Sequence, residues 1–439
     1  MKRSRQIVDP GRDGIFVCRG GRRVFSWISV VWILVSLCAL SSCSGPPKGL
    51  EDSLASPWQS GILDKQDDGS QWVAASGGWA HSAGIRTDGS LWVWGLNSYG
   101  QLGNSGSAGT DAPARMGRDR DWAFLSTGYA HTLAIKKDGT LWAWGANGMG
   151  QLGDGSRRNT HEPVQVMPPK KWRDVAAGTS HSLGIQEDGS LWAWGRNAEG
   201  QLGDGTLVAS ETPVRIGSDS DWKSVAAGDA HSIAVKEDGS LWTWGSGELG
   251  QIGDGLRAGS MAPRRIVMGG SWVKIAAGKW HSLAIRDDGT LWGWGGNIWG
   301  QLGDGTSTYK LFPVQIGNDN DWKAVCAGEY HSLAVKLDGS LWSWGSNAFG
   351  QLGTGVSRDC SSPERIGNAT RWSSVSAGDH HCLAISDDGS LWGWGYNGYG
   401  QVFGGPSADV SLPVAIGKPS KKKFRFSVLL ELFQGKPIR

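Results

Sequence analysis

Residues 222–245 read WKSVAAGDAHSIAVKEDGSLWTWG, and the same pattern returns along the chain with a period of 50 residues. Seven histidines mark this period without a slip: His81, His131, His181, His231, His281, His331 and His381. A period near 50 is typical of solenoids and propellers, in which each repeat is one supersecondary unit. The repeat therefore organises the chain from Trp72 onward.

Each repeat contains four short extended segments. In one unit they cover residues 213–216, 222–228, 231–235 and 241–244. An Asp-Gly pair separates the last two segments in all seven units, and Asp-Gly is the strongest short hairpin signal. Four-stranded antiparallel units in tandem are propeller blades. The sequence therefore predicts an all-β, seven-bladed β-propeller with four antiparallel strands per blade.

The Pro-x-x-Ile segments, such as Pro213–Ile216, are offset from the other three. None precedes Trp72, and the last one, Pro413–Ile416, has no tryptophan after it, since Lys422 stands at that position. We expect the C-terminal strand to complete the first blade, the one that begins at Trp72, and so to close the ring without exposed sheet edges. The proline suits an edge strand, where its missing N–H costs no ladder bond.

The net charge of +2 is distributed unevenly. Residues 1–42 carry +5 and residues 418–439 carry +6, so the body between them carries −9. An acidic body lacks the basic footprint that a phosphate backbone requires. We therefore expect no nucleic acid as a partner.

The N-terminal 42 residues have the features of a signal peptide. Arg22 and Arg23 precede an apolar run over residues 24–40, which is short for a membrane span. The sequence Leu40-Ser-Ser-Cys43 resembles a bacterial lipobox, whose cysteine receives a lipid after cleavage. This resemblance implies lipidation at Cys43 and a bacterial cell-envelope protein, with the membrane contacted through the lipid anchor. Ser44 favours an outer-membrane lipoprotein, and the alternatives are a secreted protein or an uncleaved N-terminal helix.

Three further segments complete the domain organisation. Residues 43–71 are expected to be a linker, residues 72–417 the propeller, and residues 418–439 a basic and apolar tail. The tail is interpreted either as a short helix packed on the propeller or as a basic patch near anionic lipid.

Three cysteines remain besides those of the signal and Cys43: Cys326, Cys360 and Cys382. Their odd number and spacing indicate neither a disulfide framework nor a zinc site, although one disulfide stays open. We expect neither a metal nor a cofactor.

The repeated unit A-x-G-x-x-H-S-L-A-I-x-x-D-G-S-L-W-x-W-G-x-N-x-x-G-Q-L-G resembles the regulator-of-chromosome-condensation repeat, including its bacterial, tubulin-suppressor-like branch. The resemblance covers about residues 72–417 and implies a seven-bladed propeller. It leaves the function open, because the family includes nucleotide-exchange factors, a plant ultraviolet-B photoreceptor and secreted β-lactamase inhibitors.

Residues that are identical in all repeats indicate architecture. We interpret the histidine ring as half-buried side chains that hydrogen-bond the backbone of their own blade, rather than as a metal site. The repeated tryptophans are interpreted as wedges between blades, since each Trp-x-Trp pair points to one face of its strand.

Positions that differ between repeats are better candidates for function. Just before the repeated histidines lie the predicted partner-binding residues Trp79, Tyr129, Asp229, Lys279, Trp280, Glu329, Tyr330, Asp379 and His380. A second variable position lies in the long loop before each Pro-x-x-Ile segment, at Tyr99, Met149, Glu199, Leu249, Trp299, Phe349 and Tyr399. Aromatic residues with a few charges have the composition of an interaction hot spot. For the second set, local packing of the loop is an equally good explanation.

One repeat departs from the pattern. Gly247 stands where the other six have asparagine, so we expect its loop to have a different conformation.

These observations predict a membrane-anchored, monomeric binding scaffold whose variable loop face binds a protein partner. The chain is not expected to be an enzyme, because no Ser/His/Asp or paired-carboxylate constellation stands outside the symmetric pattern. The alternatives are an inhibitor of a secreted or periplasmic enzyme and a carbohydrate-binding propeller.

Overall fold

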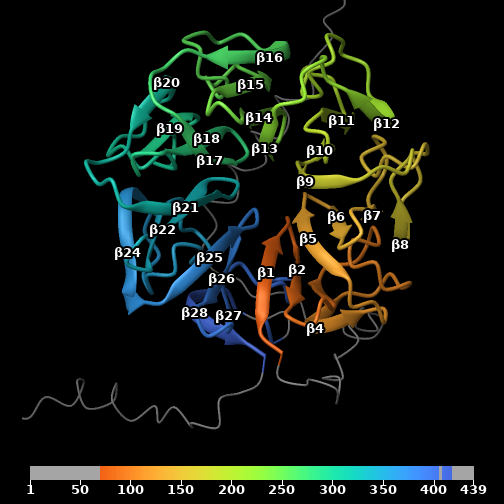
Figure 1. Ribbon diagram of the computed structural model, residues 1–439. Coiled ribbons are helices and arrows are strands. Elements are labelled where there is room, and N and C mark those ends of the chain that lie inside the picture. Colours follow the sequence, from red (N-terminus) through yellow and green to blue (C-terminus); the bar gives the residue numbers. More distant parts are fainter. Residues whose placement is uncertain (1–69, 405–407, 418–439) are drawn as a thin grey trace, which may run out of the picture. The chain divides into compact units, whose positions relative to one another are not determined.

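The computed structural model describes residues 70–404 and 408–417. Within these residues, 28 strands form seven antiparallel sheets of four strands each, which confirms the seven-bladed propeller (Figure 1). We number the sheets blades 1 to 7 in chain order. Cys43, the predicted signal peptide and the predicted C-terminal tail lie outside the described residues.

Every blade takes its four strands from one continuous stretch of chain. Blades 1 to 4 consist of β1 (Trp72–Gly77), β2 (His81–Arg86), β3 (Leu91–Gly95), β4 (Thr110–Met116); β5 (Trp122–Thr127), β6 (His131–Lys136), β7 (Leu141–Gly145), β8 (Thr160–Gln165); β9 (Trp172–Ala177), β10 (His181–Gln186), β11 (Leu191–Gly195), β12 (Ser210–Arg215); β13 (Trp222–Ala227), β14 (His231–Lys236), β15 (Leu241–Gly245) and β16 (Ser260–Ile266). Blades 5 to 7 consist of β17 (Trp272–Ala277), β18 (His281–Arg286), β19 (Leu291–Gly295), β20 (Lys310–Gln315); β21 (Trp322–Ala327), β22 (His331–Lys336), β23 (Ser340–Gly345), β24 (Cys360–Thr370); β25 (Trp372–Ala377), β26 (His381–Ser386), β27 (Leu391–Gly395) and β28 (Val410–Ile416).

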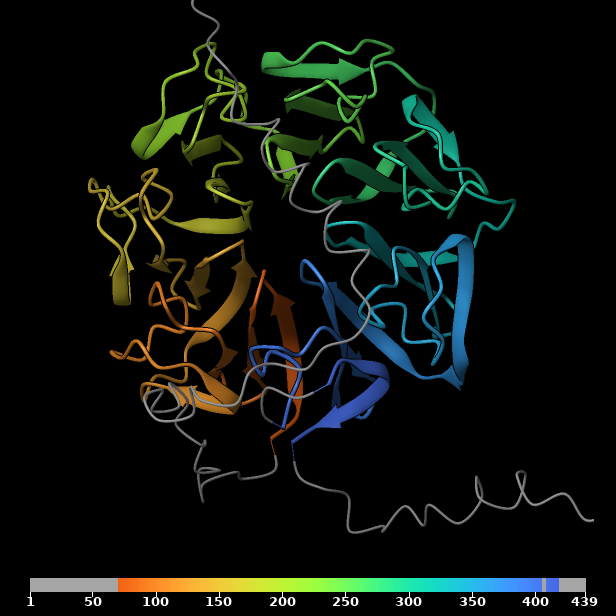
Figure 2. The ribbon, with the colours of Figure 1, turned by 180° about the vertical axis from the view of Figure 1, so that it is seen from behind.

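The predicted closure of the ring by an exchanged strand is wrong. The C-terminal strand β28 pairs with β27 of its own blade, where Leu391 lies opposite Ile416, and blade 1 has its own fourth strand, β4. Each proline-containing segment is the fourth and outermost strand of the blade formed by the three strands before it, and it lies at the rim of the ring (Figures 1 and 2). Their prediction as edge strands is confirmed, while their assignment to the following blade is not.

The ring closes through the same contacts that join any two neighbouring blades. The N–H of Trp72 donates to the Gly389 carbonyl of blade 7 at 2.9 Å, just as the N–H of Trp122 donates to Gly89 of blade 1 at 3.1 Å. Trp72 and Ile416 also share one buried apolar cluster. The first and last blades are therefore docked side by side without sharing a strand.

The repeated histidines form these junctions, and the expected bonding of their rings is corrected. Each ring is fully buried, and at the seven junctions of the described ring its Nε2 lies 2.8–3.1 Å from a hydroxyl or thiol of the next blade. At the junction of blades 1 and 2, that hydroxyl is Thr132 Oγ1, which donates its hydrogen to the Gln101 carbonyl at 3.1 Å. Because the hydroxyl has only one hydrogen, His81 must donate from Nε2. The histidines therefore bridge blades, and burial keeps the rings neutral because it lowers their pKa.

The tryptophans pack between blades, as predicted. Trp122 of blade 2, for example, is buried against Ile85 and Leu91 of blade 1, beside Trp144. The indole of Trp144 also donates to the Gln101 carbonyl at 2.9 Å. One backbone carbonyl thus receives two side-chain donors from the neighbouring blade, which fixes the angle between blades.

The end of the blades that carries the Asp-Gly turns is regular. Lys236 lies over the rings of Trp222 and Trp242 and forms ion pairs with Asp219 and Asp221 at 2.6 and 2.9 Å. Lys136 and Lys336 are held in the same way in blades 2 and 6. In these blades the ion pairs therefore satisfy the aspartates, and the cation–π contacts hold the lysine in place.

The three cysteines of the propeller are not paired. Cys326, Cys360 and Cys382 are free thiols, so the disulfide left open by the sequence does not form.

Among the described residues, no helix is long and apolar enough to cross a membrane.

Candidate functional site

The variable residues gather at one end of the blades, which we call the loop face. It carries the turn between the first two strands of each blade and the long loop between the third and fourth strands, which are residues 78–80 and 96–109 in blade 1. The innermost strands end here around the central channel. Their tips enclose a cavity of about 280 Å³. The residues that follow the last glycine of each tip line it: Trp79, Tyr129, Thr179, Asp229, Lys279, Glu329 and Asp379.

Aromatic side chains form a continuous series of ring contacts on one side of this cavity. Trp79 stacks on Tyr129 with centroids 4.6 Å apart and also contacts Tyr399 at 5.8 Å. Tyr399 contacts Tyr396 at 6.0 Å, and Tyr396 contacts Phe349 at 5.1 Å. These contacts cross from blade 2 through blades 1 and 7 to blade 6.

A second group of touching rings lies on blades 5 and 6. Tyr330 contacts Trp280 at 5.2 Å and Trp299 at 6.4 Å. We call the two groups together the aromatic arc, which consists of Trp79, Tyr129, Trp280, Trp299, Tyr330, Phe349, Tyr396 and Tyr399. Aromatic pairs at such distances add to the stability of the surface beyond their area of contact.

A charge network, which consists of Lys279, Glu329 and His380, joins the two groups. One Glu329 oxygen pairs with Lys279 and the other lies 2.8 Å from His380 Nε2. Lys279 lies over both Trp280 and Tyr330, at 5.1 and 5.3 Å from their ring centroids. His380 contacts Phe349 at 4.9 Å, which completes the path from one aromatic group to the other.

The electrostatics of this network favour the charged forms of Lys279 and Glu329. Burial alone would raise the pKa of Glu329, but hydrogen bonds from His380 and Lys279 outweigh it and lower the pKa to about 2. Burial would lower the pKa of Lys279, but its bond to Glu329 raises that pKa above the usual value. Burial and the Glu329 charge together raise the pKa of Tyr330 to about 12. The pair is therefore ionised at neutral pH, beside a neutral tyrosine.

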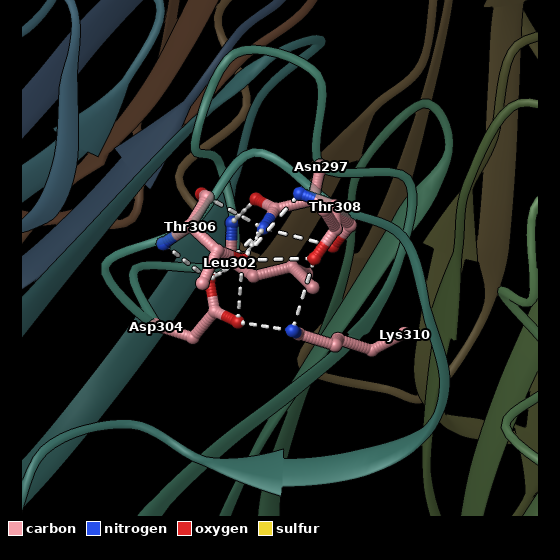
Figure 3. Close-up of polar contacts among 6 residues, drawn as sticks. All are labelled: Asn297, Leu302, Asp304, Thr306, Thr308 and Lys310. Atoms are coloured by element: carbon pink, nitrogen blue, oxygen red, sulfur yellow. Dashed lines mark hydrogen bonds and ion pairs between the residues drawn. The ribbon is translucent and has the colours of Figure 1, made fainter.

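The loops that carry half of the arc are held by a repeated asparagine. In blade 5, Asn297 Nδ2 donates to Asp304 Oδ1 at 2.9 Å and to the Thr306 carbonyl at 3.0 Å (Figure 3). Asn297 Oδ1 accepts from the N–H of Leu302 at 2.9 Å. One buried amide thus ties together both ends of a loop of more than ten residues.

A repeated glutamine fixes the tip of the same loop. The backbone N–H of Trp299 donates to Gln301 Oε1 at 2.9 Å, and the equivalent N–H groups of Tyr99, Met149, Glu199, Leu249, Phe349 and Tyr399 are bound in the same way. The loop conformation is thus held by bonds from the repeated asparagine and glutamine side chains, and the variable side chains take no part in these bonds. Tyr99, Met149 and Trp299 are accordingly 43–44% exposed. This favours surface contact over local packing for these three.

The loop with Gly247 differs as expected. A Cβ at residue 247 would lie 2.1 Å from the Ala258 carbonyl oxygen. In blades 3 and 5, the carbonyl at the matching position, Val208 or Thr308, instead accepts from the asparagine amide at 3.2 Å. In blade 4 the backbone has therefore moved into the space that the asparagine side chain occupies elsewhere.

Comparisons with known proteins agree with this architecture. The RCC1-like domain matches residues 119–429, and the regulator of chromosome condensation (RCC1) repeat matches residues 72–101 and 88–135. The chain belongs to the RCC1-like family. No curated protein matches it.

Solved structures share the fold of this RCC1-like propeller. Prp20p of Saccharomyces cerevisiae, whose structure was reported with its binding to Gsp1p and histones, is 25% identical, with a TM-score of 0.67 over 80% of this chain and 88% of its own. Yeast RCC1 (Prp20) with Kap60 bound to it is 22% identical, with a TM-score of 0.68 over 87% and 92%. Human WBSCR16 is 24% identical, with a TM-score of 0.67 over 75% and 94%. The last two show the fold alone.

The structure of this RCC1-like propeller brings most of the predicted site residues together. Trp79, Tyr129, Trp280 and Tyr330 belong to the arc, and Lys279, Glu329 and His380 form the network that joins its two groups. Asp229 and Asp379 line the cavity instead. Among the described residues, no group of three or more His, Cys, Asp or Glu side chains could hold a metal ion.

Sequence reasoning missed Tyr396, which lies at the junction of Phe349, His380 and Tyr399. The signal was present, because the residue after the third-strand glycine also varies between repeats: Leu96, Ala146, Arg196, Ser246, Gly296, Ser346 and Tyr396. On blades 3 and 4, small or polar side chains stand at the positions of the arc residues. Thr179, for example, stands where blade 1 has Trp79, and Ala230 stands where blade 5 has Trp280. The loop face of this propeller is therefore aromatic on one side and polar on the other.

Proposed function

We propose that the loop face binds a protein partner, with the aromatic arc as the main contact. The observation that supports this most is that two groups of touching rings, which come from five blades and are joined by the charge network, lie around the channel mouth. Aromatic anchors on a preorganised surface lose little conformational entropy when a partner binds. That yeast Prp20p, a member of the same fold, was reported with its binding to Gsp1p and histones is consistent with this proposal.

The polarity of the face gives the partner one orientation. The apolar part of the contact covers blades 5, 6, 7, 1 and 2, while blades 3 and 4 offer polar groups such as the Arg196–Glu199 pair at 2.6 Å. Protein interfaces commonly combine an apolar contact area with polar groups at its border, and here the polar groups lie on one side. A binding scaffold, not an enzyme, is the function that this arrangement supports best.

Site-specific photo-crosslinking tests the proposal. A photoreactive amino acid at Tyr129, which is 36% exposed, should capture a partner in the cells that make the protein. The same amino acid at Leu337, which is 70% exposed in an Asp-Gly turn at the other end of blade 6, should not. Equal capture at both positions, or capture from Leu337 alone, would refute the loop face as the interface.

The captured partner then allows a quantitative test. The double variant Trp280→Ala/Tyr330→Ala should weaken its affinity by at least 30-fold, because truncated hot-spot aromatics typically cost about 2 kcal/mol or more. The melting temperature should fall by only a few degrees, because both rings are half-buried and lie outside the apolar clusters of the blades, so that mainly their contact with each other and with Lys279 is lost. If the partner is an enzyme and its activity falls on binding, the protein is an inhibitor; if only glycans are captured, it is a lectin.

We further propose that Cys43 carries a lipid and anchors the propeller in a bacterial envelope membrane. The support is the sequence alone, in which a signal-like apolar run ends at Leu40-Ser-Ser-Cys43. Metabolic labelling with a radioactive fatty acid should label the full chain, and Cys43→Ala should abolish both the label and its recovery with membranes. Cys360→Ala is the matched control, since Cys360 is a free thiol of the propeller. Label that survives Cys43→Ala would refute this anchor.

A further inference from the structure

The cavity at the channel mouth is small, and charged side chains line part of its wall. Its volume of about 280 Å³ lies just below the range of pockets that enclose a drug-sized ligand. Four of the seven residues at the tips carry a carboxyl or amino group: Asp229, Lys279, Glu329 and Asp379. The cavity is thus sized for one side chain and lined by three carboxyl groups and one ammonium.

Two of these carboxyl groups are available to a ligand. Glu329 is bound by both Lys279 and His380. Within the described part of the chain, the Asp229 and Asp379 side chains form no hydrogen bond or ion pair, although both line the cavity. A carboxylate that is largely enclosed by protein and has no partner is costly, so it favours a cation that can reach it.

The wall beside Asp379 is aromatic. The N–H of Asp379 donates to the Gly78 carbonyl at 3.2 Å, directly before Trp79, whose ring stacks on Tyr129. Indole and phenol faces attract cations and also cover the methylene stem of a long side chain. Carboxylates and aromatic faces therefore meet at the same opening.

We propose that the channel mouth binds one lysine or arginine side chain of the partner, with its cationic group between Asp379 and Asp229 and its stem against Trp79 and Tyr129. The proposal deepens the proposed function and rests on it, since it names the side chain that the partner presents at the centre of the interface.

The ionisation of the site sets its pH dependence. Burial first, and then the Glu329 charge, raise the pKa of Asp379 to about 7, while Lys279 and His380 act in the opposite direction and Asp229 adds to the rise. A bound cation favours the ionised carboxylate. Binding should therefore strengthen as the pH rises from 6 to 8, and binding should in turn lower the pKa of Asp379.

Ligand-observed saturation-transfer NMR on the full chain tests the proposal. The probes are N-acetyl-lysinamide and N-acetyl-argininamide, and their neutral matched controls are N-acetyl-norleucinamide and N-acetyl-citrullinamide. We expect millimolar binding of a cationic probe, at least tenfold stronger than that of its neutral counterpart. Binding of only one of the two cationic probes would identify the side chain concerned.

Isosteric variants show where the cationic probe binds. Asp379→Asn should lower the affinity for the cationic probe at least tenfold and abolish the rise of this affinity between pH 6 and 8. Asp319→Asn should change neither, because Asp319 lies at the opposite end of the blades in an ion pair with Lys336. Equal binding of neutral and cationic probes, or an unchanged affinity in Asp379→Asn, would overturn the proposal. The two proposals can be refuted separately. If crosslinking captures a partner but no cationic probe binds, the cation site is refuted and the protein interface stands. If a cationic probe binds but crosslinking captures no partner, the protein interface is refuted and the cation site stands.

Discussion

Replacing Ser82 by alanine tests how the ring is closed. The Ser82 hydroxyl donates to the Gln401 carbonyl at 2.8 Å and lies 2.8 Å from His381 Nε2, so that it joins blade 1 to blade 7. Without it, the Gln401 carbonyl keeps the indole of Trp94 as a donor at 2.8 Å. The His381 N–H, in contrast, is left buried without an acceptor.

The expected cost follows from that one orphaned donor. Leaving a buried hydrogen-bonding group unsatisfied costs about 1–3 kcal/mol, so Ser82→Ala should lower the free energy of unfolding by about 2 kcal/mol. Ser232→Ala is the matched internal variant, because Ser232 makes the same bonds to His181 and to the Gln201 carbonyl between blades 3 and 4. In a closed ring the two losses should be equal, since no junction is terminal.

Urea unfolding followed by circular dichroism and tryptophan fluorescence measures both losses, with the dependence on denaturant unchanged between variants. A loss in Ser232→Ala with none in Ser82→Ala would show that blades 1 and 7 are not docked in solution. No loss in either variant would refute the assignment of the histidine as donor.

Three further predictions concern residues that depart from the repeat or recur in it. Cys382→Ser should raise the free energy of unfolding by about 0.5–1 kcal/mol, because a hydroxyl bonds His331 and the Gln351 carbonyl better than the thiol does at 3.1 and 3.2 Å; a decrease would mean that apolar packing of the sulfur dominates. Burial lowers the pKa of the seven repeated histidines to about 3 or 4. Below pH 6.5 the histidines of the unfolded chain therefore bind protons before those of the folded chain do. Each histidine should lower the free energy of unfolding by about 1.4 kcal/mol per pH unit, down to its folded pKa. Unfolding curves that do not change between pH 7 and 5 would contradict the burial of these histidines as neutral rings. Gly247→Ala should cost about 1–3 kcal/mol in thermal or urea unfolding, since its Cβ would meet the Ala258 oxygen, whereas Gly148→Ala, in open space at the next position of the matching loop of blade 2, should cost much less; equal effects would argue against the collapsed loop.

The fold could be predicted from local signals, but the strand pairing could not. The 50-residue period and the Asp-Gly turns identify the blades, because turns and tandem repeats are encoded by neighbouring residues. Whether Pro413–Ile416 pairs with the strand before it or with the first blade depends on contacts across the ring. One signal favoured the correct answer. The first strand of each blade ends in small residues, which are needed where the tips of neighbouring blades meet: a Cβ on Gly77 would lie 2.8 Å from the Gly378 nitrogen. This pattern indicates that the first strands are the innermost ones, so the proline-containing strand cannot lie on their inner side.

The positions of the candidate site were predictable, and their pairings were not. Variation between repeats singled out Glu329 and Asp379 equally, because both stand at the same place in their units. The structure separates them: Glu329 is bound by Lys279 of one neighbouring blade and His380 of the other, while Asp379 faces the cavity. These roles depend on which blades are adjacent in the ring, which a comparison of repeats one by one does not reveal.

Because no strand is shared between the first and last blades, the position of the chain ends is not fixed by the architecture. A link of five residues, 117–121, joins Met116 of blade 1 to Trp122 of blade 2. Ile416 and Trp72 occupy the same relative places at the junction of blades 7 and 1. A linker of that length between them should therefore allow circular permutation at any of the other inter-blade links. Each permuted protein would keep all its strand pairs and would present its termini at a different junction between blades.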